Sequence, residues 1–173
     1  KDGNAVSMTS TVEGPFGSHL MAGGFILNNE LTDFSMLPEL NGRKIANRVE
    51  PNKRPMSSMT PTIIFKDKNL FALTGSPGGT SIINYVTKSV LGLIDWSLDP
   101  SEVTELPHYM NRGNYTELEK NTVLENLEIE LESLGHPIKI QNKRSGLHIA
   151  LKKDNGYIGA ADPRREGLVI PIN

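Results

Sequence analysis

Two adjacent glycines, Gly78 and Gly79, are the residues of this sequence best placed to do chemistry. They end the stretch Thr74-Gly75-Ser76-Pro77-Gly78-Gly79, which joins an apolar run to a helical pattern that begins near Ser81. Glycines leave backbone N–H groups uncovered by side chains, and a helix N-terminus adds partial positive charge at the same place. Such a junction can hold an anion, either a bound phosphate or the oxyanion that forms when an amide is attacked.

The phosphate hypothesis fits the sequence poorly. A P-loop requires a Lys directly after its last glycine, but Gly79 is followed by Thr80. The stretch does not match the dinucleotide fingerprint G-x-G-x-x-G either. Two interpretations stay open from spacing alone: an oxyanion site, and a glycine-rich turn that only connects a strand to a helix.

Acidic residues and a serine pair suggest a second cluster. Glu13, Glu30 and Asp33 lie at predicted strand ends or turns, and Ser57-Ser58 lies in a basic loop bounded by Pro51 and Pro61. A ligand with both an ammonium and a carboxylate needs these two kinds of group on opposite sides. Solvated carboxylates and ordinary turn residues are the alternative, and the residues alone favour it.

Other chemistries find little support. The chain has no cysteine, which excludes a disulfide, a thiol nucleophile and a zinc–thiolate site. Its four histidines have no metal-ligand spacing and are expected to be structural or at the surface: His19, His108, His136 and His148. A Ser/His/Asp triad stays open, although no G-x-S-x-G motif supports one. No cofactor is expected.

Composition limits the partners. The net charge of −2 gives no reason to expect nucleic acid or an anionic membrane as a partner. No apolar run approaches about 18 residues, so no membrane span is expected, and no signal peptide is visible. The chain begins with Lys1 in a strand-like pattern, which suggests a processed product or a trimmed fragment.

The pattern along the chain predicts one α+β domain over residues 1–173, because strands are followed by helices and then by strands again. Strands are expected at 4–12, 24–27, 62–65, 70–74, 138–140, 147–151 and 157–160, with the one at 24–27 short and buried and a hairpin joining 62–65 to 70–74. Helices are expected at 79–95, from Asp99-Pro100-Ser101, and around Leu124 to Leu134 with a capping box of Thr122 and Glu125. Residues 36–58 are expected to be a loop.

Long motifs in the right order resemble the small subunit of γ-glutamyltransferases. They are Asp2-Gly3-Asn4-Ala5-Val6-Ser7, Leu27-Asn28-Asn29-Glu30-Leu31-Thr32-Asp33-Phe34-Ser35, the loop at 51–62, the glycine stretch, and Gly159-Ala160-Ala161-Asp162-Pro163-Arg164. The resemblance extends from Lys1 to about Gly167. Cephalosporin acylases share this pattern, so these motifs do not separate the two families.

The resemblance implies the fold of N-terminal-nucleophile hydrolases, an αββα sandwich, of which this chain would be a part. In that family a precursor cleaves itself into a large and a small subunit. The new N-terminal Thr of the small subunit attacks the γ-glutamyl amide of substrates such as glutathione, with its own α-amine as base, and water or an amino acid resolves the acyl-enzyme.

The resemblance also implies residue roles. The N–H groups of Gly78 and Gly79 would form the oxyanion hole, and Thr11 would hydrogen-bond the nucleophile. Ser57 and Ser58 would bind the α-carboxylate of the glutamyl group, and the α-ammonium would lie among three carboxylates: Glu13, Glu30 and Asp33.

Three departures from the family pattern matter. Many members have Asn at the position of Glu13 and Gln at that of Glu30, so the pocket is expected to be more acidic here. The loop between Ser35 and Pro51 is short beside members that have a lid, which predicts a more open site. The nucleophilic Thr is expected upstream of Lys1, and the large subunit is expected to supply an Arg.

Several hypotheses therefore remain. The main one is a γ-glutamyl hydrolase or transferase whose fragment is inactive alone; the others are a glutaryl-cephalosporin-type acylase and a non-catalytic binding or scaffold domain of the same fold. A missing strand is expected to leave an unpaired sheet edge that pairs with another copy. The resemblance implies a periplasmic or extracellular location, which the composition does not distinguish from the cytoplasm.

Overall fold

The computed structural model describes residues 3–171, whose contacts divide the chain into two compact units. The larger unit takes in residues 58–173 together with residues 1–9, as far as they are described, and the smaller unit takes in residues 10–57. The expectation of one domain over residues 1–173 stays a prediction.

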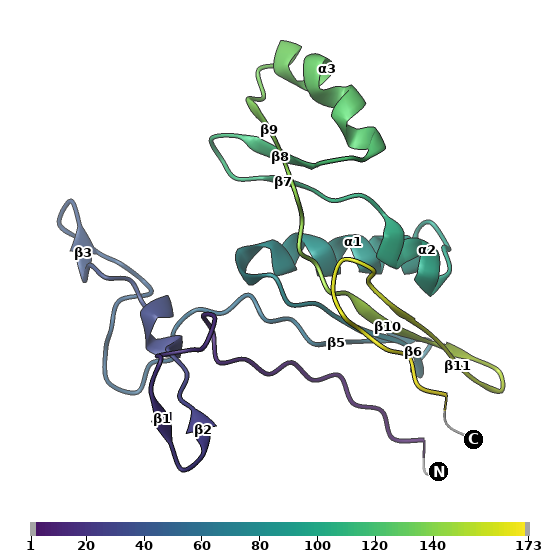
Figure 1. The fold of residues 1–173 in the computed structure, drawn as a ribbon, viewed down its shortest axis with the longest axis horizontal. Coiled ribbons are helices and arrows are strands. Elements are labelled where there is room, and N and C mark those ends of the chain that lie inside the picture. Colours follow the sequence, from purple (N-terminus) through teal and green to yellow (C-terminus); the bar gives the residue numbers. More distant parts are fainter. Residues whose placement is uncertain (1–2, 172–173) are drawn as a thin grey trace. The chain divides into compact units, whose positions relative to one another are not determined.

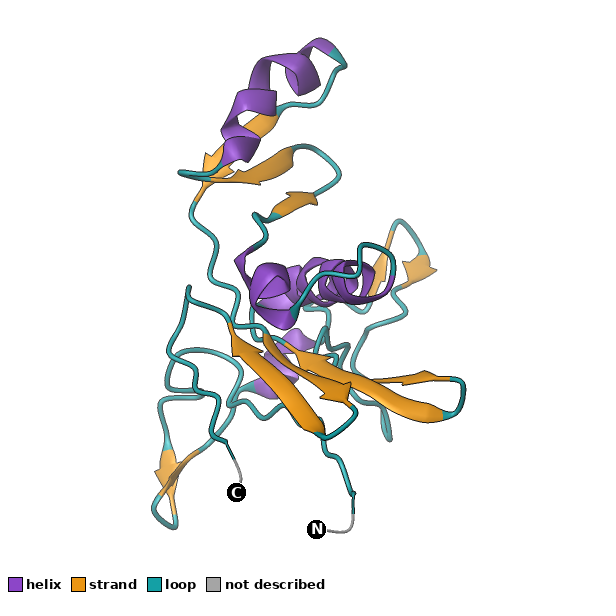
Figure 2. Cartoon of the chain, turned by 90° about the vertical axis from the view of Figure 1, so that its right-hand side faces the viewer, coloured by secondary structure: helices purple, strands orange, loops and turns teal. Residues whose placement is uncertain are grey.

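The larger unit is built on a four-stranded antiparallel sheet (Figures 1 and 2). Its strands are β5 (Thr62–Lys66), β6 (Asn69–Gly75), β10 (His148–Lys153) and β11 (Gly156–Ala161), in the order β11-β10-β6-β5. The predicted hairpin is confirmed, since β5 pairs with β6, and β10 pairs with β11 in the same antiparallel way. Within the described residues, β5 and β11 each have one neighbour, so the sheet has two open edges.

Two helices pack on one face of this sheet (Figure 2). The chain passes from β6 through a 3₁₀ turn, η2 (Gly79–Ser81), into α1 (Ile82–Ile94), so the helix predicted over 79–95 is confirmed with a tighter first turn. Next comes α2 (Pro100–Glu105), whose capping box joins Asp99 and Glu102. The apolar side chains that meet between helices and sheet are Ala72, Leu93, Val103, Ile149 and Leu151.

A three-stranded sheet follows α2 in the larger unit. It contains β7 (Tyr109–Asn111), β8 (Thr116–Glu119) and β9 (Ile138–Gln141), with β8 and β9 parallel. The connection from β8 to β9 holds η3 (Val123–Leu127) and α3 (Glu128–Ser133), so the third predicted helix is confirmed but begins as a 3₁₀ turn.

The cap of this third helix differs from the predicted reciprocal box. The side chain of Thr122 accepts a hydrogen bond from the N–H of Leu124, while the carboxylate of Glu125 accepts one from the N–H of Asn121. A 3₁₀ turn brings different amides within reach than an α-helical turn does, which accounts for the change of partners. Gly135 follows the helix with φ +88°, as its predicted capping role requires.

The smaller unit holds short elements: β1 (Met21–Ala22), β2 (Phe25–Ile26), η1 (Glu30–Asp33), β3 (Glu39–Leu40) and β4 (Arg43–Lys44). The predicted buried strand at 24–27 is wrong about burial, because Phe25 is 74% exposed. Residues 36–58 are not loop alone, since β3 and β4 form a small hairpin. Its turn residues Asn41 and Gly42 both have positive φ, the geometry that suits a two-residue hairpin turn.

The predicted strand at 4–12 is wrong for the described residues, which form no ladder there. The period-two pattern is real, since Ala5, Ser7 and Thr9 are half-buried while Val6 and Met8 are exposed. A strand also needs a partner for its backbone, and both edges of β6 are already taken by β5 and β10. The hydroxyl of Ser7 donates to the carbonyl of Thr74, which fixes this segment beside the end of β6.

Two absences hold for residues 3–171. No helix there is long and apolar enough to cross a bilayer. No group of three His, Asp or Glu residues in the same range could hold a metal ion.

Candidate active site

The glycine turn has backbone conformations that only glycine adopts without strain. Gly78 has φ +141° and Gly79 has φ +57°, and both precede the first turn of α1. Among the described residues, neither N–H has a hydrogen-bond acceptor, whereas the carbonyls of Gly78 and Gly79 accept from Ser81 and Ile82. The turn therefore presents two unused N–H donors at a helix N-terminus.

Tyr85 packs directly behind this turn. A Cβ atom on Gly78 would lie 2.7 Å from Cε2 of Tyr85, so a larger residue has no room there. Burial raises the pKa of Tyr85, and the nearby side chain of Ser81 and backbone of Arg144 oppose this shift. By contrast, a Cβ atom on Gly79 would meet nothing within 4 Å. The turn is thus backed by an aromatic ring at its first glycine and open at its second.

The segment before the turn is fixed by the loop that precedes β10. Ser76 is 2% exposed; its hydroxyl donates to the carbonyl of Pro77 and accepts from the N–H of Gly146 at 3.1 Å. A Cβ atom on Gly146 would lie 2.8 Å from Cγ of Pro77. This close approach leaves the backbone before Gly78 little freedom.

In the smaller unit, Asn29 brings together two of the predicted site residues. Its side-chain nitrogen donates to the carboxylate of Glu13 at 2.6 Å, and its side-chain oxygen accepts from the N–H of Gly14 at 2.9 Å. The N–H of Glu13 in turn donates to the hydroxyl of Thr11 at 2.8 Å. Glu13 has φ +71°, so these contacts hold a non-glycine residue in a left-handed conformation.

Glu30 and Asp33 lie on the 3₁₀ turn η1, which begins directly after Asn29. The N–H of Glu30 donates to the side chain of Asn28, and the carbonyl of Asp33 accepts from the side chain of Asn47. Both residues are thus fixed through their backbones. Their carboxylates have no hydrogen bond or ion pair within the described part of the chain and are available to a cation.

Ser57 and Ser58 lie outside any helix or strand, where the smaller unit ends and the larger unit begins. The carbonyl of Ser58 accepts from the hydroxyl of Thr60 at 2.7 Å. Ser57 is exposed and Ser58 is half-buried. The role expected of this pair, binding a carboxylate, stays a prediction.

Sequence reasoning missed a buried polar chain in the larger unit. Lys88 Nζ lies 2.7 Å from Nδ1 of His108, whose Nε2 lies 2.7 Å from the hydroxyl of Ser145, which donates to Asp162. Burial, together with the nearby Lys88 charge, lowers the pKa of His108 to about 2, and burial lowers that of Lys88 to about 7.

The order of these hydrogen bonds shows that Ser145, His108 and Asp162 are not a catalytic Ser/His/Asp triad. Ser145 lies between His108 and Asp162 and gives its proton to the carboxylate, so the imidazole does not activate the hydroxyl as a nucleophile. All three side chains are fully buried. The histidine ring also packs against Tyr85, with 4.2 Å between ring centroids. The buried polar group therefore supports Tyr85, which lies behind Gly78.

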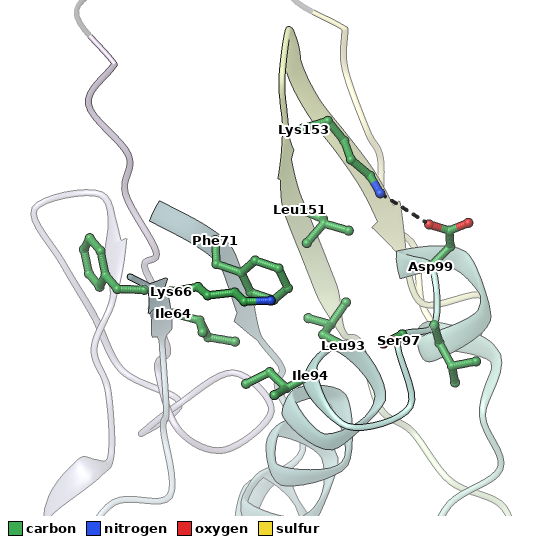
Figure 3. Close-up of a pocket in the computed structure, with 11 residues that line it drawn as sticks. Ile64, Lys66, Phe71, Leu93, Ile94, Ser97, Asp99, Leu151 and Lys153 are labelled. Carbon is green, nitrogen blue, oxygen red and sulfur yellow. Dashed lines mark ion pairs between the residues drawn. The ribbon is translucent and has the colours of Figure 1, made fainter. Parts of the chain in front are cut away.

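A pocket of about 370 Å³ lies elsewhere in the larger unit, at the C-terminal end of α1 (Figure 3). Its lining is mainly apolar and includes Ile64, Phe71 and Leu93, with Lys153 and Asp99 3.9 Å apart at its side. The glycine turn lies at the other end of α1, about 20 Å away for a helix of this length. This pocket is therefore separate from the candidate active site.

Comparison with known proteins shows what this chain is similar to. The gamma-glutamyltranspeptidase family model matches residues 1–172. The glutathione hydrolase proenzyme of Bacillus subtilis is 40% identical over 179 residues, which cover 99% of this chain but 29% of the proenzyme. The chain thus spans less than a third of that relative.

Solved structures give the same result for the fold. A mutant gamma-glutamyltranspeptidase of Helicobacter pylori superposes with a TM-score of 0.82 at 35% identity, covering 94% of this chain and 95% of the matched chain. A cephalosporin acylase of Bacillus halodurans has a TM-score of 0.73 at 21% identity, covering 85% of this chain and 27% of that one, and shares the fold alone. The predicted N-terminal-nucleophile hydrolase fold is confirmed.

Proposed function

Because this chain belongs to the gamma-glutamyltranspeptidase family, we propose that it is the small-subunit part of an enzyme that hydrolyses or transfers γ-glutamyl groups, with glutathione among its substrates. The observation that carries the proposal is the glycine turn, which offers two free N–H donors where β6 leads into α1. Such donors stabilise the oxyanion formed when an amide is attacked.

The nucleophile is proposed to be an N-terminal Thr upstream of this chain, released when a precursor cleaves itself. Its hydroxyl attacks the γ-carbonyl carbon, its α-amine takes the proton, and the same proton passes to the departing amine. Internal threonines such as Thr9 and Thr11 have their nitrogens in peptide bonds and cannot serve as this base. The similar proenzyme, more than three times the length spanned here, supports a precursor that also contains a large subunit.

Gly78 and Gly79 are proposed to donate to the oxyanion through their N–H groups, and Thr11 to orient the nucleophile. Once the amine leaves, the glutamyl group is an ester on the threonine. Water then yields glutamate, or an acceptor amine yields a new γ-glutamyl amide, and in both cases the threonine hydroxyl is regenerated. No cofactor is needed for either route.

The glutamyl head group is proposed to bind through its two charges. Ser57 and Ser58 take the α-carboxylate, with an Arg from the large subunit, and the α-ammonium lies among three acidic side chains: Glu13, Glu30 and Asp33. The free carboxylates of Glu30 and Asp33 favour γ-glutamyl over glutaryl substrates, because a glutaryl group has no ammonium to offset them. The likeness to the cephalosporin acylase adds no such reason for a glutaryl substrate.

The test uses the whole precursor, from which a large subunit and a small subunit that contains this chain are expected. The self-cleaved protein should release a chromogenic amine from a γ-glutamyl anilide faster than from the matched glutaryl anilide. Residues 1–173 alone, and a precursor with Ala in place of the upstream Thr, should release none. A correctly cleaved protein that turns over neither anilide would refute the proposal, and a preference for the glutaryl anilide would favour an acylase.

The large subunit is also the partner proposed for the exposed apolar side chains of the N-terminal segment, Val6 and Met8. Without it, the open edges at β5 and β11 are proposed to pair with another copy of the chain. A periplasmic or extracellular location is proposed from the family resemblance. Fractionation of the source cells followed by the anilide assay would test it.

A further inference from the structure

One guanidinium group joins the 3₁₀ turn η2, which leads into α1, to the three-stranded sheet. Arg112 follows β7, where its N–H donates to the carbonyl of Tyr115 and closes the turn between β7 and β8. From this turn its side chain donates to the hydroxyl of Thr80 at 2.8 Å and to that of Ser81 at 2.7 Å. Those two residues come directly after the glycine pair.

A buried carboxylate holds the guanidinium in this position. Nε of Arg112 donates to Glu117 at 3.0 Å, and the other oxygen of Glu117 pairs with Lys143. Although burial raises the pKa of Glu117, hydrogen bonds from Arg112 and Lys143 lower it overall, so this carboxyl is ionised at neutral pH. Arg112 is thus fixed at its own backbone and at its Nε, while both terminal nitrogens reach the helix turn.

The contact reaches the glycine turn by two routes. Through the backbone, Thr80 is the residue next to Gly79, and the N–H of Ser81 donates to the carbonyl of Gly78 at 3.2 Å. Through side chains, Ser81 accepts from Arg112 and lies near enough to Tyr85 to lower its pKa, and the ring of Tyr85 lies behind Gly78. A shift of Arg112 would therefore be felt at both glycines.

Helix stability alone does not account for a cation at this place. The N-terminus of a helix carries partial positive charge and favours anions, so a guanidinium there opposes the helix dipole. A cation beside two free N–H groups does suit a site where negative charge develops during a reaction.

We propose that Arg112 is a positioning residue of the oxyanion site, which fixes Thr80 and Ser81 and so holds the N–H groups of Gly78 and Gly79 in place. This role rests on the proposed function, because it presumes that an oxyanion forms at the glycine turn. Arg112 acts through its neighbours and need not touch the substrate.

The test compares variants in the self-cleaved enzyme, with rates expressed per cleaved molecule. Arg112→Ala should lower kcat for a γ-glutamyl anilide about tenfold while KM changes little, because the interaction matters only once the oxyanion forms. Arg112→Lys should recover little of that loss, since one ammonium cannot contact two hydroxyls and a carboxylate in the same geometry. Lys120→Ala, which removes an exposed positive charge directly after the neighbouring strand β8, should leave kcat unchanged.

Coupling to the turn gives a second measurement. Thr80→Ala combined with Arg112→Ala should lower kcat no further than Arg112→Ala alone, because the hydroxyl of Thr80 contacts Arg112 and both changes break that same contact. Additive losses, an unchanged kcat, or a loss confined to KM would each overturn the proposal.

Hydrogen exchange separates this proposal from the proposed function. Arg112→Ala should speed amide exchange at Ser81 and Ile82, whose N–H groups donate to the carbonyls of Gly78 and Gly79, and leave β10 and β11 unchanged, whether or not the protein turns over an anilide. If the wild-type enzyme is inactive on γ-glutamyl amides, the proposed function fails, and faster exchange would still support the positioning contact. Unchanged exchange at the turn would overturn it.

Discussion

Nε2 of His108 lies 2.7 Å from the hydroxyl oxygen of Ser145, and both side chains are fully buried. Since Ser145 gives its own proton to Asp162, the hydroxyl accepts from His108, which must carry its proton on Nε2. The other ring nitrogen, Nδ1, is then the acceptor for Lys88 Nζ, which also donates to the carbonyls of Leu106 and Pro107. In this series of hydrogen bonds each group therefore donates to the next, from Lys88 through His108 and Ser145 to Asp162.

The first prediction concerns Ser145, which lies within this series of hydrogen bonds. Ser145→Ala should lower the free energy of unfolding by about 1–3 kcal/mol, because it leaves a buried imidazole N–H without its acceptor and removes a donor from Asp162. Urea denaturation measures this change. Ser133→Ala is the control, since the exposed Ser133 hydroxyl donates only to the carbonyl of Glu130, and it should cost much less. Equal effects of the two substitutions would contradict the prediction.

The second prediction is a pH dependence of stability. The pKa of His108 is lowered to about 2 in the folded protein by burial and by the Lys88 charge, against about 6.5 in an unfolded chain. The unfolded state therefore binds more protons between these values, and stability should fall as the pH drops below about 6.5, by up to about 1.4 kcal/mol per pH unit. Urea titrations at pH 7, 6 and 5 measure the slope.

His108→Gln should flatten this slope, since an amide does not titrate. The titration of Lys88 affects stability in a different pH range. Its pKa of about 7 in the folded protein lies below the unfolded value of 10.5, so its contribution changes above neutral pH. The pKa of Asp162 is also lowered, although burial raises it, by hydrogen bonds from Ser145 and Arg164, and its protonation costs stability only at more acidic pH. A slope between pH 7 and 5 that survives in His108→Gln would exclude His108 as its source.

The third prediction separates the two glycines. Gly79→Ala places a methyl group where nothing lies within 4 Å, so the fold should survive with a loss of about 1–2 kcal/mol from the positive φ. Activity should fall much more, about a hundredfold in kcat, because the methyl group would stand beside the N–H that is proposed to donate to the oxyanion. Gly135→Ala is the matched control, with φ +88° and equally open surroundings at the end of α3, and it should leave kcat unchanged.

Gly78→Ala should behave differently, because its methyl group would meet the ring of Tyr85 at 2.7 Å. It should lower stability by more than Gly79→Ala does, as well as abolishing turnover. If the two substitutions cost the same in urea denaturation, the ring of Tyr85 does not constrain Gly78 in the way described.

The parts of the fold that the sequence predicted correctly are those that depend on local sequence patterns. The hairpin β5–β6, the helix after the glycine pair and the cap at Gly135 each depend on a pattern confined to a few neighbouring residues. The strand expected at 4–12 failed because a strand also requires a partner with a free edge, which a local pattern cannot specify.

The site residues show the same difference between local patterns and contacts across the fold. The sequence pointed to Gly78 and Gly79 because their chemistry is in their own backbone. It missed Arg112, and it missed Ser145 beside His108, because these contacts join residues 31 to 37 positions apart in the sequence. No sequence periodicity identifies two residues that meet across the fold. The available signal was the presence of His108 and Arg112 in a short segment, 107–114, that is rich in turn residues.

The last prediction tests whether the acidic turn recognises an ammonium. Glu30→Gln should raise KM for a γ-glutamyl anilide about tenfold, because it removes a carboxylate that the described residues leave unpaired and so weakens a charge-assisted contact. KM for the matched glutaryl anilide, which has no α-ammonium, should stay the same or fall. Glu39→Gln, on the exposed strand β3, is the control for loss of a negative charge from the smaller unit and should change neither value. If Glu30→Gln raised both KM values equally, Glu30 would act on the shape of the turn instead of on the charge of the substrate.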